Sequence, residues 1–394
     1  MTDFNRDIAD LVVAYKDAIK RIQAELLSLD LSDMSRAKTE AALREITAML
    51  AALNEESAVW VAKYVPEASA AGVVGTMVAL GTADSYADAV KTARISRVNS
   101  TYVNAVIADT QADLLAVTQN VDRRVRAAIR QATAESMRAN MAAGINGRRT
   151  INRDTLAAMR RVLGSAVETG IIDAGGRRWK PEVYVDMVTR TKLAETERQT
   201  MINESIARNV RYGIISSHAA TDACRFYEGK IVKLTPEAPG NYPFIGNLPR
   251  RDIFHPNCRH VVTPIRDPKR ILGRDAQEPA HNPLPHIDRA IIPKEKLLDY
   301  ALDSEHVTGK YKAVAFKSAL GYDKRNWRDL VANMRANLPY HEAVRRPETK
   351  YGTPYSVRMS IIGPNGKTAN VMSGWIIRAD EAEPRLTSIY VDDK

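Results

Sequence analysis

Apolar side chains recur at steps of three or four residues through most of the chain up to about Ala219. One series runs from Leu11 to Leu29, and a second runs from Leu43 to Trp60 after a Ser/Asp-rich break at residues 32–35. An α-helix turns once in about 3.6 residues, so this spacing places the apolar side chains on one helical face. We therefore expect amphipathic helices in the first half of the chain.

A third helical series begins at Val103 and continues through residues 121–161, which hold ten arginines and three acidic residues. This charge excess could follow phosphate groups or a negatively charged protein surface. The alternative is a solvated helix face, which the lack of interleaved aromatic side chains favours. Glycines at residues 170–176 interrupt the helices, and a further helix is expected at residues 181–209, with a proline in its first turn.

The sequence changes character at about Tyr212. Two short strand-like runs, at residues 212–216 and 230–234, precede a loop rich in Pro and Gly at residues 236–249. A proline-spaced linker follows at residues 268–285. This composition indicates a small α+β domain with long loops.

The last part of the chain has helical periodicity first and strand periodicity afterwards. We expect helices at residues 294–303, 310–319 and 325–338, and strands at residues 355–362, 368–378 and 385–391. Asn365-Gly366 stands between the first two strands, and this pair is a strong hairpin signal.

The predicted fold class is α+β, in several domains. We expect a mostly helical region at residues 1–178, a Pro/Gly-rich α+β domain at residues 179–267, the linker at residues 268–285, and a C-terminal domain at residues 286–394. In that last domain, helices precede an antiparallel sheet.

Both cysteines of the chain and three of its seven histidines lie within about forty residues. Thiolate and imidazole are the ligands that zinc prefers, so we predict a structural zinc site. Its candidate ligands are Cys224, His255, Cys258 and His260, with His218 in reserve. The alternative is that the histidines hydrogen-bond a proline-pinned turn while the cysteines are small buried apolar side chains.

Three sequence segments carry a family resemblance: WKPEVYVDMVTRTKLAETERQ from Trp179, IISSHAATDACRFYEGKIVKL, and FHPNCRHVVTPI. They are similar to the phage minor capsid protein 2 and MuF-type head-morphogenesis families. Asp222, Cys224 and Gly229 match the first part of the family pattern, and the His-Pro-Asn-Cys-Arg-His box at residues 255–260 matches its end. Many relatives have a second cysteine shortly after the first, where this chain has Arg225-Phe226-Tyr227. His218 would have to replace that ligand.

This resemblance implies a minor component of a tailed-phage head that assists assembly. Its implied partners are the portal protein and the major capsid or scaffolding protein, with contact to genomic DNA as a further option. Its implied location is the virion, in the capsid interior or at the portal vertex, and the host cytoplasm during assembly. The resemblance covers roughly the first 285 residues and does not imply catalysis.

Four pieces of the C-terminal region, from about Ile287, carry a second resemblance: HVTGKYKA at residues 306–313, the segment at residues 321–327, GPNG at residues 363–366, and WII at residues 375–377 followed by PRLTS at residues 384–388. They resemble a domain of unknown function found at the tips of bacterial polymorphic toxins. The resemblance implies membership of a class of metal-independent ribonucleases that groups Barnase, EndoU, colicin and RelE. RNA is therefore the substrate that the resemblance implies. Cleavage without a metal needs a base, an acid and cations for the phosphorane charge. The residues of suitable type are His306, Lys310, Lys312, Arg385 and Thr387. Each also has an ordinary structural role open to it, such as a helix cap for the histidine, a solvated helix face for the lysines or a strand position for the threonine.

Charge and hydropathy bound the remaining possibilities. The formal net charge is +10, which favours polyanionic partners and leaves a nucleic-acid-binding role without catalysis as a third hypothesis. Two cysteines make a secreted disulfide framework improbable and indicate a reducing compartment. The N-terminal residues lack the order of a signal peptide, and no apolar run reaches the ~20 residues of a spanning helix, so we expect no membrane span.

Overall fold

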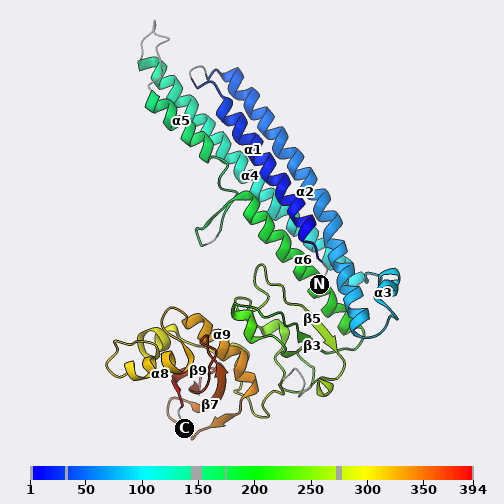
Figure 1. Ribbon diagram of the computed structural model, residues 1–394, viewed down its shortest axis with the longest axis vertical. Helices are drawn as coiled ribbons and strands as arrows, with labels where there is room; N and C mark the ends of the chain where they lie inside the picture. Colours follow the sequence, from blue (N-terminus) through cyan, green and yellow to red (C-terminus); the bar gives the residue numbers. More distant parts are fainter. Residues whose placement is uncertain (1–2, 32–33, 143–152, 174, 272–276, 393–394) are drawn as a thin grey trace. The chain divides into compact units, whose positions relative to one another are not determined.

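The computed structural model of this chain describes residues 3–31, 34–142, 153–173, 175–271 and 277–392 (Figure 1). The chain forms two compact units. One comprises Met1–Val74 and Thr92–Thr200, and the other comprises Gly75–Lys91 and Met201–Lys394. Helices dominate the first unit and sheets occur with helices in the second, which confirms the predicted α+β class.

The first unit is built from long helices that run alongside one another (Figure 1). Their bounds are α1 Asn5–Ser28, α2 Arg36–Ala79, α4 Arg97–Ala142, α5 Arg153–Ser165 and α6 Pro181–Ala207. The last residues of α2 and α6 belong to the second unit. The predicted break between the first two helices is present, although Ser32 and Asp33 lie outside the described residues. Residues 143–152 of the arginine-rich stretch also lie outside them.

Two apolar cores lie along the first unit, and α1, α2 and α4 contribute to both. One core gathers Ile22, Leu26, Ile46, Val125 and Leu163, so α5 closes it. The other core gathers residues from the first half of α1, the middle of α2, the first half of α4, and α6, among them Leu11, Tyr15, Val61, Leu114 and Val185. The apolar series read from the sequence are therefore the faces that pack together.

Two small features of this half of the chain were not predicted. The glycine-rich stretch forms a ribbon of β1 (Ile171–Ile172) and β2 (Arg178–Trp179), turned by Asp173, whose carboxylate accepts backbone N–H groups of Gly175 and Arg177, both at 2.9 Å. The short helix α3 (Tyr86–Thr92) follows α2. Neither has enough apolar periodicity to be read from sequence.

The central part of the second unit is a three-stranded antiparallel sheet in the order β4-β3-β5. The strands are β3 Tyr212–Ile215, β4 Ile231–Lys233 and β5 Val262–Ile265. The first two occupy the predicted strand-like runs. Pro264 lies in β5, and this is compatible with the ladder because β5 is an edge strand. Short 3₁₀ turns fill the loops: η1 (Ala223–Phe226), η2 (Ile245–Asn247) and η3 (Pro268–Arg270).

The C-terminal part of the second unit has helices followed by a four-stranded antiparallel sheet in the order β6-β7-β8-β9. The helical elements are η4 Ile287–Arg289, α7 Lys294–Lys296, the π-helical turn η5 Leu297–Ala301, α8 Lys310–Leu320, α9 Trp327–Asn337 and η6 Leu338–Tyr340. The strands are β6 Ala343–Arg345, β7 Thr353–Ile362, β8 Thr368–Ile377 and β9 Arg385–Val391. The short edge strand β6 was not predicted, and the first expected helix is split between α7 and η5.

The core of this C-terminal part lies between α8, α9 and the sheet. Phe316 and Leu330 come from the helices, while Met359, Trp375 and Leu386 come from three strands, and all five are buried. The predicted hairpin joins β7 to β8, and its turn is closed by a hydrogen bond from Gly363 N–H to the carbonyl of Lys367 at 2.9 Å.

The central and C-terminal parts of the second unit also contact each other. Ala336 of α9 belongs to the core of the central sheet. Arg225 of η1 forms a 2.6 Å ion pair with Asp329 of α9, and the ammonium group of Lys230 donates a hydrogen bond to the carbonyl of Ala336. These contacts place α9 against the loops of the central sheet.

Candidate metal centre

The strand order brings the two cysteine segments to one end of the central sheet. Strand β3 pairs with β4 and β5 and is antiparallel to both. The segment that follows β3 and the segment that precedes β5 therefore leave the sheet at the same end. Ile215 pairs with Val262, and the N–H of Ser216 donates to the carbonyl of Val261 at 3.0 Å. Cys224 lies in the first segment and Cys258 in the second.

A tight turn sets the direction of His255 and Cys258. The N–H of Cys258 donates to the carbonyl of His255 at 2.9 Å, with Pro256 and Asn257 between them. Asn257 has a φ of 64°, in the left-handed region that Asn tolerates better than most residues. Pro in the second position and a left-handed residue in the third are typical of a type II turn. The His-x-x-Cys spacing is therefore one turn of the chain, and both side chains reach Cys224.

Asp222 holds Cys224 from the other side. Its carboxylate caps η1 by accepting the N–H of Cys224 at 3.0 Å. The Sγ atom of Cys224 then lies 3.1 Å from His255 Nε2 and 3.6 Å from Cys258 Sγ. The Sγ atom of Cys258 lies 3.4 Å from His260 Nδ1. All four predicted metal ligands are thus brought together, and three of them, both cysteines and His260, are buried.

The electrostatics of the pair favour one thiolate. A hydrogen bond from the Cys224 thiol, assisted by His260, lowers the pKa of Cys258 to about 4. The same hydrogen bond, together with burial, raises the pKa of Cys224. Burial works against a charged His260, but hydrogen bonds to Cys258 and Glu228 outweigh it and raise the pKa of that imidazole. A thiolate is the form of cysteine that binds a metal.

Both ring nitrogens of His255 have polar neighbours. Its Nδ1 lies 2.8 Å from the carbonyl oxygen of Pro256, which can only accept, so Nδ1 carries a proton. Its Nε2 faces Cys224 Sγ at 3.1 Å and Asp222 Oδ2 at 3.1 Å. Nε2 is therefore the ring atom that faces Cys224 and Asp222 together.

The distances fit a zinc site in part. Tetrahedral zinc, with bonds of about 2.3 Å to sulfur and about 2.0 Å to nitrogen, separates its ligand atoms by roughly 3.5 to 3.8 Å. The spacings of Cys224, Cys258 and His260 lie close to this range, and their ligand atoms are all within 4.8 Å of one another. His255 belongs instead to an overlapping group with Cys224 and Asp222. A cavity of ≈ 270 Å³ opens beside both cysteines.

Two carboxylates complete the cluster, and neither was assigned to it from the sequence. Glu228 lies 3.1 Å from His260 Nε2, on the ring atom opposite the one that faces Cys258. A carboxylate behind a histidine ligand is a common arrangement in zinc proteins. Asp222 differs, because it lies 3.1 Å from His255 Nε2, the same ring atom that faces Cys224. His218 packs on His260, with ring centres 4.1 Å apart, and the backbone N–H of His218 donates to the carboxylate of Glu228. His218 therefore lies behind the cluster. An acidic residue on each side of Cys224 was the available sequence signal.

The predicted catalytic residues of the C-terminal region form two separate groups. His306, Lys310 and Lys312 lie around the start of α8. The Nδ1 atom of His306 accepts the N–H groups of Thr308 and Gly309, at 3.2 and 2.9 Å, so it caps the turn that precedes the helix. The His306 ring meets the Tyr300 ring edge to face, and the ammonium group of Lys312 lies 4.7 Å from the centre of the Tyr300 ring. Lys310 is exposed and lies beside Tyr311.

Arg385 and Thr387 lie near the start of β9. Arg385 forms an ion pair with Glu381 at 3.4 Å, and Thr387 is exposed. Within the described residues, no hydrogen bond or ion pair joins either of them to His306, Lys310 or Lys312. The cation proposed for a phosphorane is thus already neutralised by a carboxylate.

Comparison with known families agrees with the first of the two resemblances. Residues 34–267 match the family described as phage minor capsid protein 2, and this match covers more than half of the 394 residues. The chain belongs to this family. The match includes every residue of the cysteine–histidine cluster. Residues 283–393 match a second family, described as a domain of unknown function (DUF6883). No curated protein and no solved structure matches the chain.

Membership in the phage minor capsid protein 2 family gives the chain a capsid role and associates it with the virion. The second family is described without an activity. This match therefore does not support the toxin and ribonuclease interpretation of the C-terminal region. Among the described residues, no helix combines the length and apolar character that crossing a bilayer requires.

Proposed function

We propose that this phage minor capsid protein assists head assembly at the portal vertex and inner shell, and that its helical unit makes the contact. The observation that carries this proposal is a basic surface on α4 and α5. Arg123, Arg130, Arg160 and Arg161 are exposed, and none has an acidic partner among the described residues. The two helices pack together through Val125, Ile129 and Leu163, so these arginines belong to one helix pair.

Unpaired arginines on a rigid helix pair suit an acidic partner surface. Charge complementarity of this kind orients a partner and speeds association more than it adds affinity. An acidic face of the portal, major capsid or scaffolding protein fits it, and so does the phosphate backbone of genomic DNA. A protein surface is preferred here, since the arginines have no aromatic neighbours for base stacking.

The test is incorporation into proheads assembled in the infected host. A truncated chain of residues 1–267 should still co-purify with proheads, because it keeps the basic helix pair. Full-length protein with Arg130→Glu, Arg160→Glu and Arg161→Glu together should be lost from them at least tenfold. The matched control carries Lys310→Glu and Lys317→Glu on the exposed side of α8 and should enter normally. Exclusion of residues 1–267 together with entry of residues 283–394 would show that the docking element is wrong.

We also propose that the cluster around Cys224 and Cys258 holds a structural zinc ion. Cys224, Cys258 and His260 supply three ligands of suitable type and spacing. His255 Nε2, 3.1 Å from Cys224 Sγ, is the proposed fourth ligand and would have to move closer to Cys258 and His260 to close the tetrahedron. The chemistry that zinc would supply is cross-linking of the segment after β3 to the segment before β5. No open coordination position or reaction is implied.

Ribonuclease activity of residues 283–393 is a second candidate function. It is favoured by the grouping of His306 and Lys312 around Tyr300, with Lys312 also 5.6 Å from the ring of Tyr390. Cations beside aromatic faces are typical of surfaces that bind single-stranded nucleic acid. The full-length protein should then cleave cellular RNA in the presence of chelator, and Lys312→Ala should abolish the cleavage. An unchanged RNA profile with folded protein would remove this candidate.

A further inference from the structure

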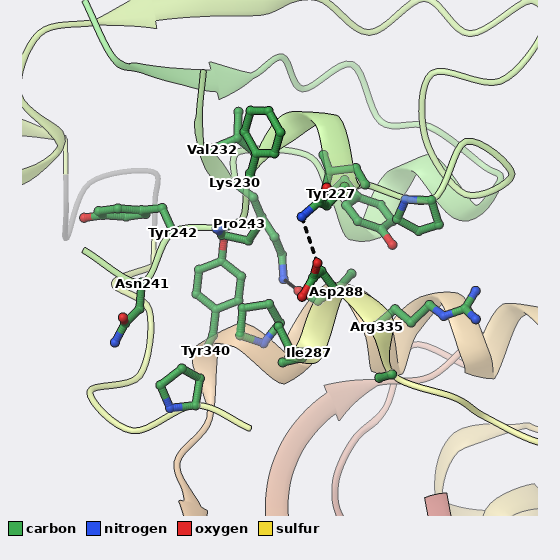
Figure 2. Close-up of a pocket in the computed structure, with 18 of the residues that line it drawn as sticks. Tyr227, Lys230, Val232, Asn241, Tyr242, Pro243, Ile287, Asp288, Arg335 and Tyr340 are labelled. Atoms are coloured by element: carbon green, nitrogen blue, oxygen red, sulfur yellow. Dashed lines mark hydrogen bonds between the residues drawn. The ribbon is translucent and has the colours of Figure 1, made fainter. Parts of the chain in front are cut away.

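A second cavity lies where the central part of the second unit meets its C-terminal part. Its volume is ≈ 370 Å³, within the range of small-molecule sites. Strand β4 and the segment of residues 241–249 form one side (Figure 2). The segment of residues 283–290 and the C-terminal end of α9 with η6 form the other. The walls combine four aromatic rings and four prolines with aliphatic side chains, which suits a flat apolar ligand.

Lys230 enters this cavity from the residue before β4. Figure 2 shows its side chain extending between Tyr340 and Asp288. The ammonium group donates hydrogen bonds to the carbonyl of Ala336 and, at 3.2 Å, to the side-chain oxygen of Asn337. It lies 4.2 Å from the centre of the Tyr340 ring. An ammonium group has three N–H donors, so one is left for a ligand.

Tyr340 supplies a second donor from the opposite side of the cavity. The residue is only 6% exposed, and its hydroxyl is buried without a hydrogen-bond partner among the described residues. A buried phenol hydroxyl normally has a partner, because leaving it unpaired costs about 1–3 kcal/mol. A ligand with an acceptor oxygen would remove this deficit.

The other charged and titratable groups around Lys230 are already engaged or point elsewhere. The carboxylate of Asp288 accepts a hydrogen bond from Asn247 at 2.8 Å. The guanidinium of Arg335 points away from Lys230 in Figure 2 and lies 3.9 Å from Asp252. The Tyr227 hydroxyl lies 3.4 Å from Asp252, and His341 Nδ1 donates to the carbonyl of Asn337. Tyr242 lines the side of the cavity that also carries Lys230. Lys230 and Tyr340 are therefore the donors of the cavity, while the exposed carboxylate of Asp288 keeps further acceptor capacity at its edge.

We propose that this cavity binds a small aromatic carboxylate. Its ring packs among the tyrosine and proline side chains, and its carboxylate accepts hydrogen bonds from Lys230 Nζ and Tyr340 Oη. Lys230 and Tyr340 both line the cavity and supply two donors, and an anion compensates the ammonium group in its sheltered position. This site is separate from the metal cluster and from the capsid contact.

Protonation provides a readout that a purely structural lysine would not give. Burial lowers the pKa of Lys230 to about 7, so at pH 7.5 most of the amine is neutral in the free protein. A bound carboxylate favours the ammonium form and raises that pKa. Binding should therefore take up a fraction of a proton at pH 7.5, and the uptake should disappear at pH 5.5, where the amine is already charged.

The experiment is calorimetric titration of the full-length protein with 2-naphthoate, in buffers of different ionisation enthalpy. Matched probes are benzoate, a smaller carboxylate, and 2-naphthylmethylamine, a cation with the same ring. We expect 2-naphthoate or benzoate to bind at one site with proton uptake, and the amine not to bind. Lys230→Met should weaken binding roughly tenfold or more, and Tyr340→Phe roughly threefold or more. Lys233→Met, on β4 but outside the cavity lining, should change nothing.

Three results would overturn the proposal. The first is that neither 2-naphthoate nor benzoate binds. The second is that 2-naphthylmethylamine binds as tightly as 2-naphthoate. The third is that both Lys230→Met and Tyr340→Phe leave carboxylate binding unchanged. Tyr340→Phe guards against a folding artefact. It removes one oxygen atom, which has no hydrogen-bond partner among the described residues.

Discussion

Pro256 and Asn257 show how two residues outside the candidate ligand set determine the geometry of the cysteine–histidine cluster. They close the turn that lets His255 and Cys258 face Cys224 together. The proline restricts its own φ, and the asparagine accepts a left-handed conformation that most residues adopt only with strain. The candidate ligand types could be read from the sequence. The turn explains why the His-x-x-Cys spacing lets His255 and Cys258 both contact Cys224.

Zinc content is the prediction that belongs to this scale. Purified full-length protein should contain about one equivalent of zinc, because a closed structural site is nearly full. Cys258→Ser should reduce it to less than about 0.1 equivalent, since serine is a poor zinc ligand. Elemental analysis of the purified proteins gives the numbers directly.

His218→Ala is the matched control for the zinc measurement. His218 is a histidine of the same cluster, but its ring lies behind His260 and contacts no cysteine. It should keep the full equivalent. Loss of zinc in this variant would mean that His218 is a ligand and His255 is not. Wild-type protein without zinc would leave the cluster as a hydrogen-bonded turn.

Residue type alone did not determine role in the C-terminal part. His306 has the side chain of a general base, but its Nδ1 is occupied by two backbone N–H groups. Arg385 has the charge to stabilise a phosphorane, but Glu381 lies against it. Lys230 was not singled out as a site residue from the sequence. Tertiary packing buries its amine and lowers the pKa of that amine to about 7.

At the scale of elements, the junction between α8 and the β7–β8 hairpin depends on close backbone contact. A Cβ atom at Gly363 would lie 2.0 Å from the carbonyl oxygen of Leu320, the last residue of α8. Gly366, in the same hairpin turn, has a φ of 75° but has open space around it. The two glycines are therefore required for different physical reasons.

Their substitution should separate these reasons. Gly363→Ala forces a backbone shift and should lower the free energy of unfolding by at least about 2 kcal/mol. Gly366→Ala adds only left-handed strain and should cost about 1 kcal/mol. Urea unfolding followed by fluorescence, with Trp60 and Trp179 replaced by Phe, leaves Trp327 and Trp375 as reporters of the C-terminal part. Equal costs for the two variants would contradict the steric account.

At the scale of the whole chain, the two compact units do not coincide with the two family matches. Residues 34–267 span part of both units, because α2 and α6 each cross the boundary between them. Residues 268–282 lie between the two matches. We keep as a proposal the division into residues 1–178, 179–267, a linker at residues 268–285, and residues 286–394.

The net charge of +10 is spread over the chain, but its functional use differs with the local structure. On α4 and α5, four arginines are exposed and have no acidic partner among the described residues: Arg123, Arg130, Arg160 and Arg161. In the second unit, Arg225 and Arg385 are paired with Asp329 and Glu381, and the amine of Lys230 is sheltered. Overall charge therefore favours acidic partners without saying which surface binds them.

Local patterns in the sequence were sufficient for most secondary structure. The series from Leu11 to Leu29 and from Leu43 to Trp60 became the buried faces of α1 and α2, and the Asn365-Gly366 hairpin formed as predicted. These features depend on neighbours a few residues away, so periodicity and turn chemistry carry them. The family was likewise recognisable from short segments around Cys224 and Cys258.

Only the tertiary structure determined which distant residues meet. Glu228 joins the metal cluster through the order β4-β3-β5, and the cavity at Lys230 exists because α9 packs on the loops of the central sheet. The candidate nuclease residues divide likewise, because Lys312 lies beside Tyr390 near the end of β9, whereas Arg385 lies at its start. Such meetings are set by packing between elements far apart in the chain, and no local sequence pattern records them.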